Sequence, residues 1–190
     1  MQNDNANSRH FVFLLASTRA NGNSEQLARH AAAHLPKDTK QTWVRLQDYA
    51  MPAFIDHRHE GDGSYATPEG AAKDLLDLTL SATDVVFVTP LYWYSLPTLA
   101  KHYLDHWSGW MRVPGLHFRE QMQGRRFWNI TVTADQDQSF AHGLVESLRH
   151  TAGYMQMPWQ GSLIGYGNRP GDVMDDAASV EKAQSYFAAA

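Results

Sequence analysis

Residues 11–25 read FVFLLASTRANGNSE: an apolar run, a short polar loop with one arginine, and the start of an alanine-rich segment. The run FVFLLA is typical of a strand that is buried on both faces, and the alanine-rich segment is typical of a helix. A strand, a tight loop and a helix in this order form the repeating unit of a parallel sheet. This stretch therefore predicts an α/β fold.

The same alternation continues along the chain. Short apolar runs predict five strands, at residues 11–16, 42–46, 85–89, 127–133 and, more weakly, 161–165. Helical composition predicts five helices, at residues 24–35, 68–81, 96–107, 140–154 and 173–187. We expect a doubly wound, five-stranded parallel sheet with helices on both faces. The pattern fits the flavodoxin-type strand order 2-1-3-4-5 and a shortened dinucleotide fold equally, because periodicity does not reveal strand order.

Two segments fall outside this alternation. Residues 56–70, DHRHEGDGSYATPEG, are polar and glycine-rich, which predicts an exposed loop before the second helix. Residues 108–123 are too irregular for a helix and are expected to form an excursion or a subunit contact. A glycosylation acceptor is spelled at residues 129–131, but it lies in a predicted buried strand, so we interpret it as a chance match.

The composition is that of a folded protein. The chain has 190 residues, of which 43% are hydrophobic and 19% are charged, and its formal net charge is −4. These values predict a single domain over residues 10–190, preceded by a flexible polar tail over residues 1–9. The scattered lysines and arginines lack the basic patch of a nucleic-acid partner.

The absence of cysteine limits the chemistry and fits a reducing compartment. Without cysteine the chain has neither disulfides nor thiolate metal sites, and redox chemistry would need a bound cofactor. No apolar run is long enough for an export signal or for membrane insertion. We therefore expect a cytoplasmic protein.

The loop after the first strand has the residues of an anion site. A helix N-terminus offers free amide groups and positive dipole charge. Gly22 leaves room for a ligand, the hydroxyls of Ser17 and Ser24 can donate hydrogen bonds, and Arg19 supplies the opposite charge. The loop matches neither the GxxxxGK[ST] nor the GxGxxG pattern, which favours a single phosphomonoester. The alternative is a turn and helix cap without a ligand.

Two residues at the start of this helix carry further expectations. Asn23 is expected to cap the helix, with Gln26 at the third helical position. Glu25 must point outward if the loop binds phosphate, because a carboxylate in the first turn competes for the same dipole.

The loop after the third strand combines a proline with three consecutive aromatic residues. It reads Pro90-Leu91-Tyr92-Trp93-Tyr94 and lies at the carboxyl end of the strand. An aromatic slot with backbone amides at its edge suits a flat tricyclic ring. The alternative is that these side chains cover the core or a dimer contact.

Together these two loops carry a family resemblance. Ser17-x-Arg19-x-x-Gly22-Asn23-Ser24 resembles the FMN-phosphate loop of the NAD(P)H-dependent FMN reductase group in the flavodoxin-like superfamily. Residues 90–107, which include PLYWYSLP and LDHW, resemble the isoalloxazine-binding loop and following helix of flavodoxin-like quinone reductases. The resemblance extends over roughly residues 10–165 and favours the strand order 2-1-3-4-5.

The resemblance implies a function. It implies an enzyme that holds FMN, takes hydride from NADH or NADPH, and reduces a small acceptor such as a quinone or flavin by a ping-pong mechanism. It assigns no side chain as an acid or base, since hydride transfer to flavin does not require one. It also implies a homodimer or homotetramer with flavin near the subunit contact, for which Trp107 and Trp110 would suit the seam.

The chain departs from the family pattern after the fourth strand. Many relatives have a glycine-rich loop there, whereas residues 133–140 read TADQDQSF. Ala134 and Asp135 are expected to supply backbone or side-chain contacts to the ring.

Other functional interpretations are weaker. His102 and His106 have a spacing that can bind metal, but helix-surface histidines explain them better, and the acidic and histidine residues of 56–62 are ordinary loop residues, so we predict no metal site. Two alternatives to the enzyme remain: a flavodoxin-type electron carrier, and a flavin-free regulatory or binding module on the same fold.

Overall fold

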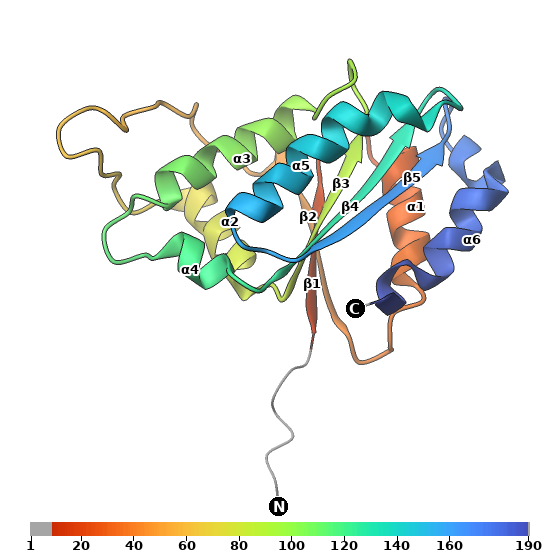
Figure 1. The fold of residues 1–190 in the computed structure, drawn as a ribbon, viewed down its shortest axis with the longest axis horizontal. Coiled ribbons are helices and arrows are strands. Elements are labelled where there is room, and N and C mark those ends of the chain that lie inside the picture. Colours follow the sequence, from red (N-terminus) through yellow and green to blue (C-terminus); the bar gives the residue numbers. More distant parts are fainter. Residues whose placement is uncertain (1–8, 190) are drawn as a thin grey trace, which may run out of the picture.

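The computed structural model describes residues 9–189, which fold into one sheet with helices on both sides (Figure 1). In chain order the strands and helices are β1 (His10–Leu15), α1 (Asn23–Ala32), β2 (Lys40–Arg45), η1 (Leu46–Asp48), α2 (Gly70–Ser81), β3 (Asp84–Pro90), α3 (Thr98–Trp110), α4 (Phe118–Met122), β4 (Arg126–Thr133), η2 (Gln138–Ala141), α5 (His142–Tyr154), β5 (Trp159–Tyr166), η3 (Asp172–Asp175), α6 (Ala177–Ser185) and η4 (Tyr186–Ala189). The short η elements are 3-10 helices.

The sheet has the predicted flavodoxin-type order. Its five strands run parallel in the order β2-β1-β3-β4-β5, which confirms the expected topology. β1 lies next to the point where the chain turns from one half of the sheet to the other. Ligands of such folds bind outside the carboxyl ends of the strands at this switch point.

Helices cover both faces of the sheet, and side chains of β1 alternate between them. Phe11 and Phe13 pack in the core beneath α1 and α6, whereas Val12 and Leu14 pack in the core beneath α2, α3, α4 and α5. Figure 1 shows α1 and α6 together on one side and the other helices opposite. This alternation follows from the two-residue period of a strand and explains the continuous apolar run.

The prediction that residues 108–123 contain no helix is wrong at both ends of this segment. α3 continues to Trp110, and α4 forms a short helix from Phe118 to Met122. Both end residues of α4 are fully buried in the core, so packing rather than intrinsic propensity stabilises this helix of five residues.

Trp107 and Trp110 do not form a subunit seam. Their exposed fractions are only 3% and 2%, and both rings pack edge to face against Phe118. The aromatic surplus that suggested a subunit contact therefore belongs to the interior of the chain.

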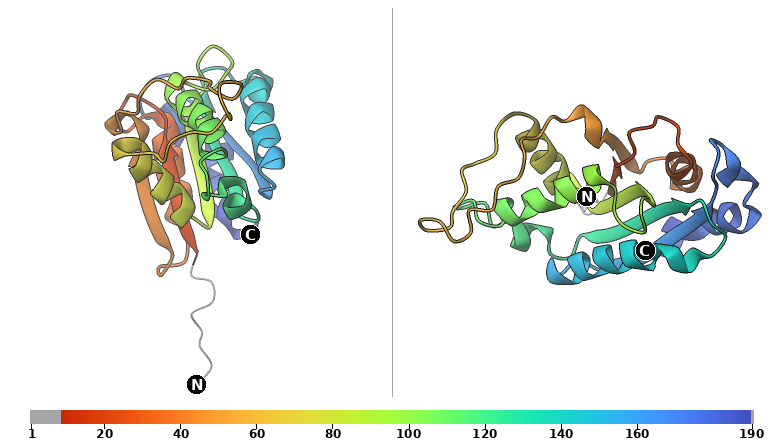
Figure 2. Two further views of the ribbon diagram at one scale, coloured as in Figure 1. Left: turned by 90° about the vertical axis from the view of Figure 1, so that its left-hand side faces the viewer. Right: turned by 90° about the horizontal axis from the view of Figure 1, so that it is seen from above.

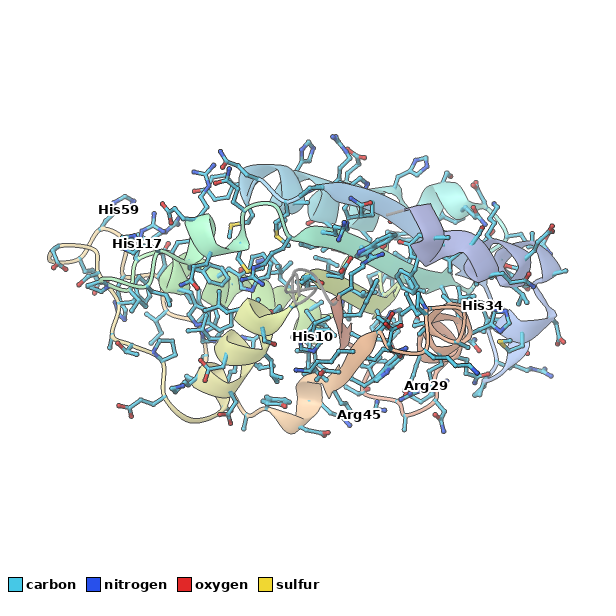
Figure 3. All side chains as sticks on the ribbon, turned by 90° about the horizontal axis from the view of Figure 1, so that it is seen from below. His10, Arg29, His34, Arg45, His59 and His117 are labelled. Carbon is cyan, nitrogen blue, oxygen red and sulfur yellow. The ribbon has the colours of Figure 1, made fainter. Side chains whose placement is uncertain are left out.

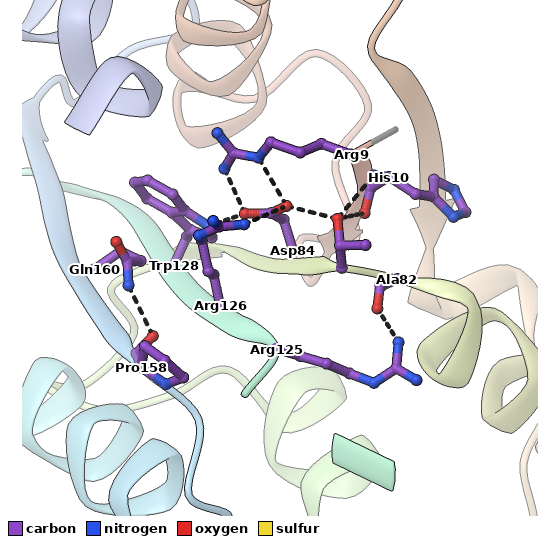
Figure 4. Close-up of polar contacts among 10 residues, drawn as sticks. Arg9, His10, Ala82, Asp84, Arg125, Arg126, Trp128, Pro158 and Gln160 are labelled. Carbon is purple, nitrogen blue, oxygen red and sulfur yellow. Dashed lines mark hydrogen bonds and ion pairs between the residues drawn. The ribbon is translucent and has the colours of Figure 1, made fainter. Parts of the chain in front are cut away.

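A buried carboxylate stabilises the side of the sheet at which the parallel strands begin, which we call the amino edge (Figure 4). Asp84, at the start of β3, is fully buried and accepts hydrogen bonds from Arg9 Nε at 3.1 Å and Nη2 at 2.5 Å. Trp128 Nε1 and Thr83 Oγ1 donate to the same carboxylate at 2.9 and 2.7 Å. Arg9 is the one residue of the predicted flexible tail that the structure describes, and residues 1–8 lie outside the described part.

The loop over residues 56–70 protrudes from the body of the fold, as the two views of Figure 2 show. Most of its residues are exposed, which confirms the prediction of an exposed loop before α2. None of the helices in residues 9–189 has the length and apolar character needed to cross a membrane.

Candidate functional site

Two adjoining cavities open at the carboxyl edge of the sheet. The first has a volume of about 310 Å³ and is lined by Ser17, Arg19, Gly22, Asn23, Ser24, Glu25, Pro90, Leu91, Tyr92, Val132, Ala134, Gly167 and Asn168. The second has a volume of about 280 Å³ and is lined by Leu91, Trp93, Tyr94, Thr133, Ala134, Asp135 and Phe140. Leu91 and Ala134 line both. We call them the loop-1 cavity and the aromatic cavity; between them they contain every residue predicted for cofactor binding.

The loop-1 cavity lies at the N-terminus of α1. Gly22 is the N-cap residue and has an extended backbone, and no side chain caps the helix. The amide groups of the first turn are therefore available to a ligand. A Cβ atom on Gly22 would lie 3.7 Å from Ser17 Oγ, an ordinary contact, so the chain itself does not require glycine there. The missing side chain leaves space directly over the helix N-terminus.

The expected role of Asn23 as the helix cap is wrong. Its side chain accepts a hydrogen bond from the Gly171 amide at 2.8 Å and donates to the Arg169 carbonyl at 2.9 Å. Gln26 Nε2 donates to the Asn21 carbonyl at 2.7 Å instead of completing a capping box. The loop after β5 closes over the start of α1, and the side chain of Asn23 links the two.

The expectation that Glu25 points outward is also wrong. Only 4% of this residue is exposed, and its carboxylate accepts hydrogen bonds from Arg29, Arg45 and the Asn21 amide. Burial by itself raises the pKa of Glu25, but these donors outweigh burial and hold the pKa below its ordinary value. Two arginines therefore neutralise the charge that was expected to oppose an anion.

Arg19 is the cation that remains available to a ligand. It is exposed, and within residues 9–189 its side chain forms no ion pair. Its backbone amide donates to Ser17 Oγ at 3.1 Å, which fixes the turn between the two residues. Ser24 is buried at the start of α1. The loop-1 cavity thus combines hydroxyls, free amides and a cation.

The aromatic residues after β3 form an exposed rim along the two cavities, where Tyr92 lines the loop-1 cavity and Trp93 and Tyr94 line the aromatic cavity. Tyr92, Trp93 and Tyr94 have exposed fractions of 48%, 92% and 61%, so they do not cover the core of this chain. Trp93 and Tyr94 have positive φ angles of 49° and 60°, a left-handed conformation that is costly for bulky residues. Paired backbone hydrogen bonds between Tyr92 and Ser95 close the turn.

The loop after β4 forms the opposite wall of the aromatic cavity. The Asp135 amide donates to Thr133 Oγ1 at 3.0 Å, and the Asp135 carboxylate accepts from the Asp137 amide at 2.9 Å. The ring of Phe140 lies 5.4 Å from that of Tyr94. Hydrogen bonds of polar residues thus stabilise this loop, at the position where many relatives were expected to have a glycine-rich loop.

Sequence reasoning missed several residues that line the cavities: Val132, Thr133, Phe140, Gly167 and Asn168. Gly167 directly follows β5, within the stretch GYGNRPG at residues 165–171. Because all parallel strands end at the same edge, that position alone was a signal that the stretch borders the site.

The residues considered for metal binding do not form a ligand set. The imidazole rings of His102 and His106 meet edge to face, 5.0 Å apart, and His106 Nε2 lies 3.0 Å from the Pro52 carbonyl. Within residues 9–189 no three histidine, aspartate or glutamate side chains come together as metal ligands would.

Comparison with known proteins decides the family. Residues 9–189 match a protein family described as having a flavodoxin-like fold. The chain belongs to this flavodoxin-like family. The resemblance stated from the two loops is therefore confirmed at the level of the family.

Individual relatives of this flavodoxin-like chain include enzymes. YwqN of Bacillus subtilis (strain 168), provisionally named an NAD(P)H-dependent FMN-containing oxidoreductase, is 28% identical over 167 residues, covering 87% of this chain and 90% of YwqN. The Trp repressor binding protein from Bacillus subtilis superposes with a TM-score of 0.73 at 25% identity, covering 93% of this chain and 97% of that one. An FMN-dependent NADH-azoreductase from Bacillus anthracis str. Ames Ancestor, solved with FMN, shares the fold with a TM-score of 0.65 at 14% identity, over 95% and 98% of the two chains.

Proposed function

We propose that this chain is an FMN-dependent NAD(P)H oxidoreductase that reduces a small acceptor such as a quinone or a flavin. The observation that carries the proposal is the pair of adjoining cavities of unlike chemistry. The loop-1 cavity offers a helix N-terminus and Arg19, and the aromatic cavity offers the rings of Trp93, Tyr94 and Phe140. A molecule with a phosphomonoester at one end and a flat ring at the other matches this pair. The name of the relative YwqN supports the same assignment.

The donors at the loop-1 cavity fit a phosphate group. The hydroxyls of Ser17 and Ser24, the first amides of α1 and the Arg19 guanidinium would hold it. Gly22 leaves the approach to these amides open. Asn23 would contribute its backbone amide, because its side chain already binds the loop after β5.

The aromatic cavity fits the edge of a flavin ring. The Leu91 amide is engaged by the Val132 carbonyl and the Asp135 amide by Thr133 Oγ1. In the described residues the amides of Trp93, Tyr94 and Ala134 donate to no other group of the chain. These donors would pair with ring nitrogen and carbonyl acceptors.

The protein's own contribution is binding and orientation. Bound FMN would supply the redox chemistry between NADH or NADPH and the acceptor. The residues at 90–94 would fix the ring, and the exposed rim would let nicotinamide and acceptor stack there in turn, giving ping-pong kinetics. We propose no side chain as an acid or base. The homodimer or homotetramer that we expect would add its contacts around this rim.

Absorbance of the purified protein tests the assignment. With FMN added, we expect the bands of bound oxidised flavin, and we expect NADH or NADPH to bleach them in the absence of oxygen. A screen of quinones and flavins would then identify the acceptor and the preferred nicotinamide. FMN that binds but stays oxidised would favour the electron carrier, and failure to bind FMN would favour the flavin-free module.

Replacing Arg19 by Ala tests how the ligand is oriented. The Arg19→Ala variant is expected to lose about 10-fold or more in affinity for FMN, because a charge-assisted hydrogen bond to phosphate contributes about 1.5–3 kcal/mol. Riboflavin has no phosphate, so its affinity should stay within about 2-fold. Fluorescence titration of both ligands measures the ratio, and Arg149→Ala, which removes an exposed arginine on α5, serves as the control. Equal losses for both ligands would overturn this placement of the phosphate.

A further inference from the structure

A buried carboxylate links three parts of the loop-1 cavity. Glu25 Oε1 accepts hydrogen bonds from Arg29 Nε at 3.0 Å and Nη2 at 2.7 Å. Glu25 Oε2 accepts from Arg45 Nη2 at 3.0 Å and from the Asn21 amide at 3.0 Å. Four donors from α1, the end of β2 and the loop after β1 therefore converge on one side chain that itself lines the cavity.

The two arginines are themselves held in place. The Arg29 guanidinium lies over the Trp43 ring at 4.2 Å, and that ring stacks on Phe13 in the core. Arg45 has a side-chain exposure of only 19%, and its Nη1 donates to the Arg19 carbonyl at 3.4 Å. Figure 3 shows Arg29 and Arg45 side by side next to α1. The carboxylate is thus fixed from both sides.

The same carboxylate holds the backbone of the loop. Asn21 has a φ of 53°, in the left-handed region, and its amide is bound by Glu25 while its carbonyl is bound by Gln26. Arg45 adds a bond to Arg19, the residue that carries the available cation. These contacts fix the turn before any ligand arrives, which lowers the entropy cost of binding.

Charge favours an anion despite the buried glutamate. Glu25 carries one negative charge, whereas Arg29 and Arg45 carry two positive charges, and Arg19 adds a third at the cavity. Without either Arg29 or Arg45 the group would be close to neutral apart from Arg19. Of these two arginines, Arg45 also contacts the loop, through the Arg19 carbonyl.

We propose that Glu25 is a positioning residue that pre-forms the loop over residues 17–22, and that Arg45 is its tether and provides, beside the cavity, the excess positive charge of this cluster that favours a phosphomonoester. This inference rests on the proposed function, since the phosphomonoester is that of FMN. It assigns a binding role to two residues that the sequence pattern did not include in the site.

Three substitutions at two residues separate positioning from charge. Glu25→Gln keeps the shape but leaves one acceptor oxygen for four donors, and it also removes a negative charge near the phosphate. Positioning predicts that FMN affinity falls at least 5-fold, whereas charge alone predicts that it rises. Arg45→Met should weaken FMN about 10-fold, and Arg45→Lys, which keeps the charge, should recover part of that loss. Riboflavin affinity should change less than 2-fold in all three variants.

Hydrogen exchange of the ligand-free protein gives a readout that does not depend on flavin. The Asn21 amide should be protected in the wild type and should exchange several-fold faster in Glu25→Gln. Arg126→Met is the matched control, because Arg126 lies 3.8 Å from a buried aspartate at the opposite edge of the sheet. It should change neither Asn21 exchange nor the FMN-to-riboflavin affinity ratio.

The outcomes separate this inference from the proposed function. If the wild type fails to bind FMN, the proposed function fails, and exchange at Asn21 still reports whether Glu25 positions the loop. If the wild type binds FMN but Glu25→Gln binds it more tightly, or weakens FMN and riboflavin equally with Asn21 exchange unchanged, the positioning role is overturned.

Discussion

At the scale of single residues, the rim of the aromatic cavity places bulky side chains on a backbone that they rarely adopt. Trp93 and Tyr94 both have left-handed φ angles, and most of the Trp93 side chain is exposed. An exposed side chain gains little from packing, so the local fold gives no reason for tryptophan at this position. Strain of this kind is concentrated at functional sites.

Trp93→Gly should therefore separate stability from binding. Glycine removes left-handed strain of about 1–2 kcal/mol and adds about 1 kcal/mol of unfolded-state entropy, so Tm should stay equal or rise slightly. Affinity for FMN and for riboflavin should fall together, since both carry the ring. Calorimetry and flavin titration measure the two effects.

Tyr154→Gly provides the comparison for that variant. Tyr154 is an exposed aromatic residue too, but it ends α5 with an ordinary helical backbone. Glycine there should cost up to about 1 kcal/mol and leave flavin binding unchanged. If Trp93→Gly destabilises the chain more than Tyr154→Gly does, the expectation that glycine relieves backbone strain at position 93 is wrong.

A buried histidine should make stability depend on pH. His10 lies at the start of β1, with Nδ1 2.9 Å from the Ser81 carbonyl and Nε2 2.8 Å from Thr42 Oγ1. Burial lowers the pKa of His10 below 6.5, the Ser81 carbonyl partly offsets this, and Lys40 lowers the pKa further. The folded state therefore favours neutral imidazole, and its stabilising contribution is present above pH 6.5 and is lost as the pH falls through the folded pKa.

Urea denaturation at several pH values checks this expectation. The free energy of unfolding should fall between about pH 7 and pH 5, and His10→Gln should show a shallower fall. His106, whose pKa is also lowered by burial, contributes a slope of the same sign that remains in the variant. An unchanged slope in His10→Gln would rule out His10 as a source.

At the scale of elements, the loop after β5 packs against the start of α1. A Cβ atom on Gly167 would lie 2.7 Å from the Val173 amide nitrogen and 2.9 Å from Asn23 Nδ2. Glycine is therefore required for the close approach that lets Asn23 bind this loop. The geometry of the phosphate loop depends on an element more than 100 residues away in the sequence.

Gly167→Ala should disturb both stability and binding. Overpacking against backbone atoms should cost about 1–3 kcal/mol and should weaken FMN more than riboflavin. Gly153→Ala is the control, because a Cβ atom there, within α5, meets nothing within 4 Å. Helix propensity predicts that the control is neutral or up to about 1 kcal/mol more stable. A Gly167→Ala protein as stable as wild type would contradict the close approach.

The sequence allowed strands to be predicted more reliably than short helices. Every apolar run became a strand, and only the ends moved by one or two residues, because burial on both faces leaves a strong signal. α4 was missed because two buried residues in five give no helical period. The predicted helix over residues 173–187 became η3, α6 and η4, because Asp176, which lies outside the regular helix, caps α6.

At the scale of the whole molecule, the two edges of the sheet have different tasks. The carboxyl edge carries the loops of the candidate site, whereas the amino edge carries the buried contacts of Asp84 with Arg9 and Trp128. Because parallel strands separate these edges by their full length, changes at one edge should leave the other largely unaffected.

Asp84→Asn tests that separation. Removing the charge leaves the Arg9 guanidinium without its carboxylate in a partly buried place, which should cost roughly 3 kcal/mol of unfolding free energy. FMN affinity of the folded variant should stay within about 2-fold of wild type. Asp105→Asn, which breaks an exposed pair with Lys101, should cost less than about 1 kcal/mol. A large loss of FMN affinity in Asp84→Asn would show that the edges are coupled.

The location of the site could be predicted from sequence, but its internal contacts could not. Strand order and the switch point bring together the loops after β1, β3 and β4, so the predicted residues line adjoining cavities. The partners of Asn23 and Glu25 come from other elements, and a single sequence contains no signal for such distant pairs. Binding of FMN by these residues stays a prediction.

The exposure of Trp93 has a practical consequence for spectroscopy. Of the six tryptophans, Trp107, Trp110 and Trp128 are buried, and Trp93 is 92% exposed. A water-soluble quencher such as iodide should therefore extinguish mainly the red-shifted emission of this one indole. A ligand seated beside it would shield it from iodide, so the chain carries its own optical reporter of occupancy, without any added label.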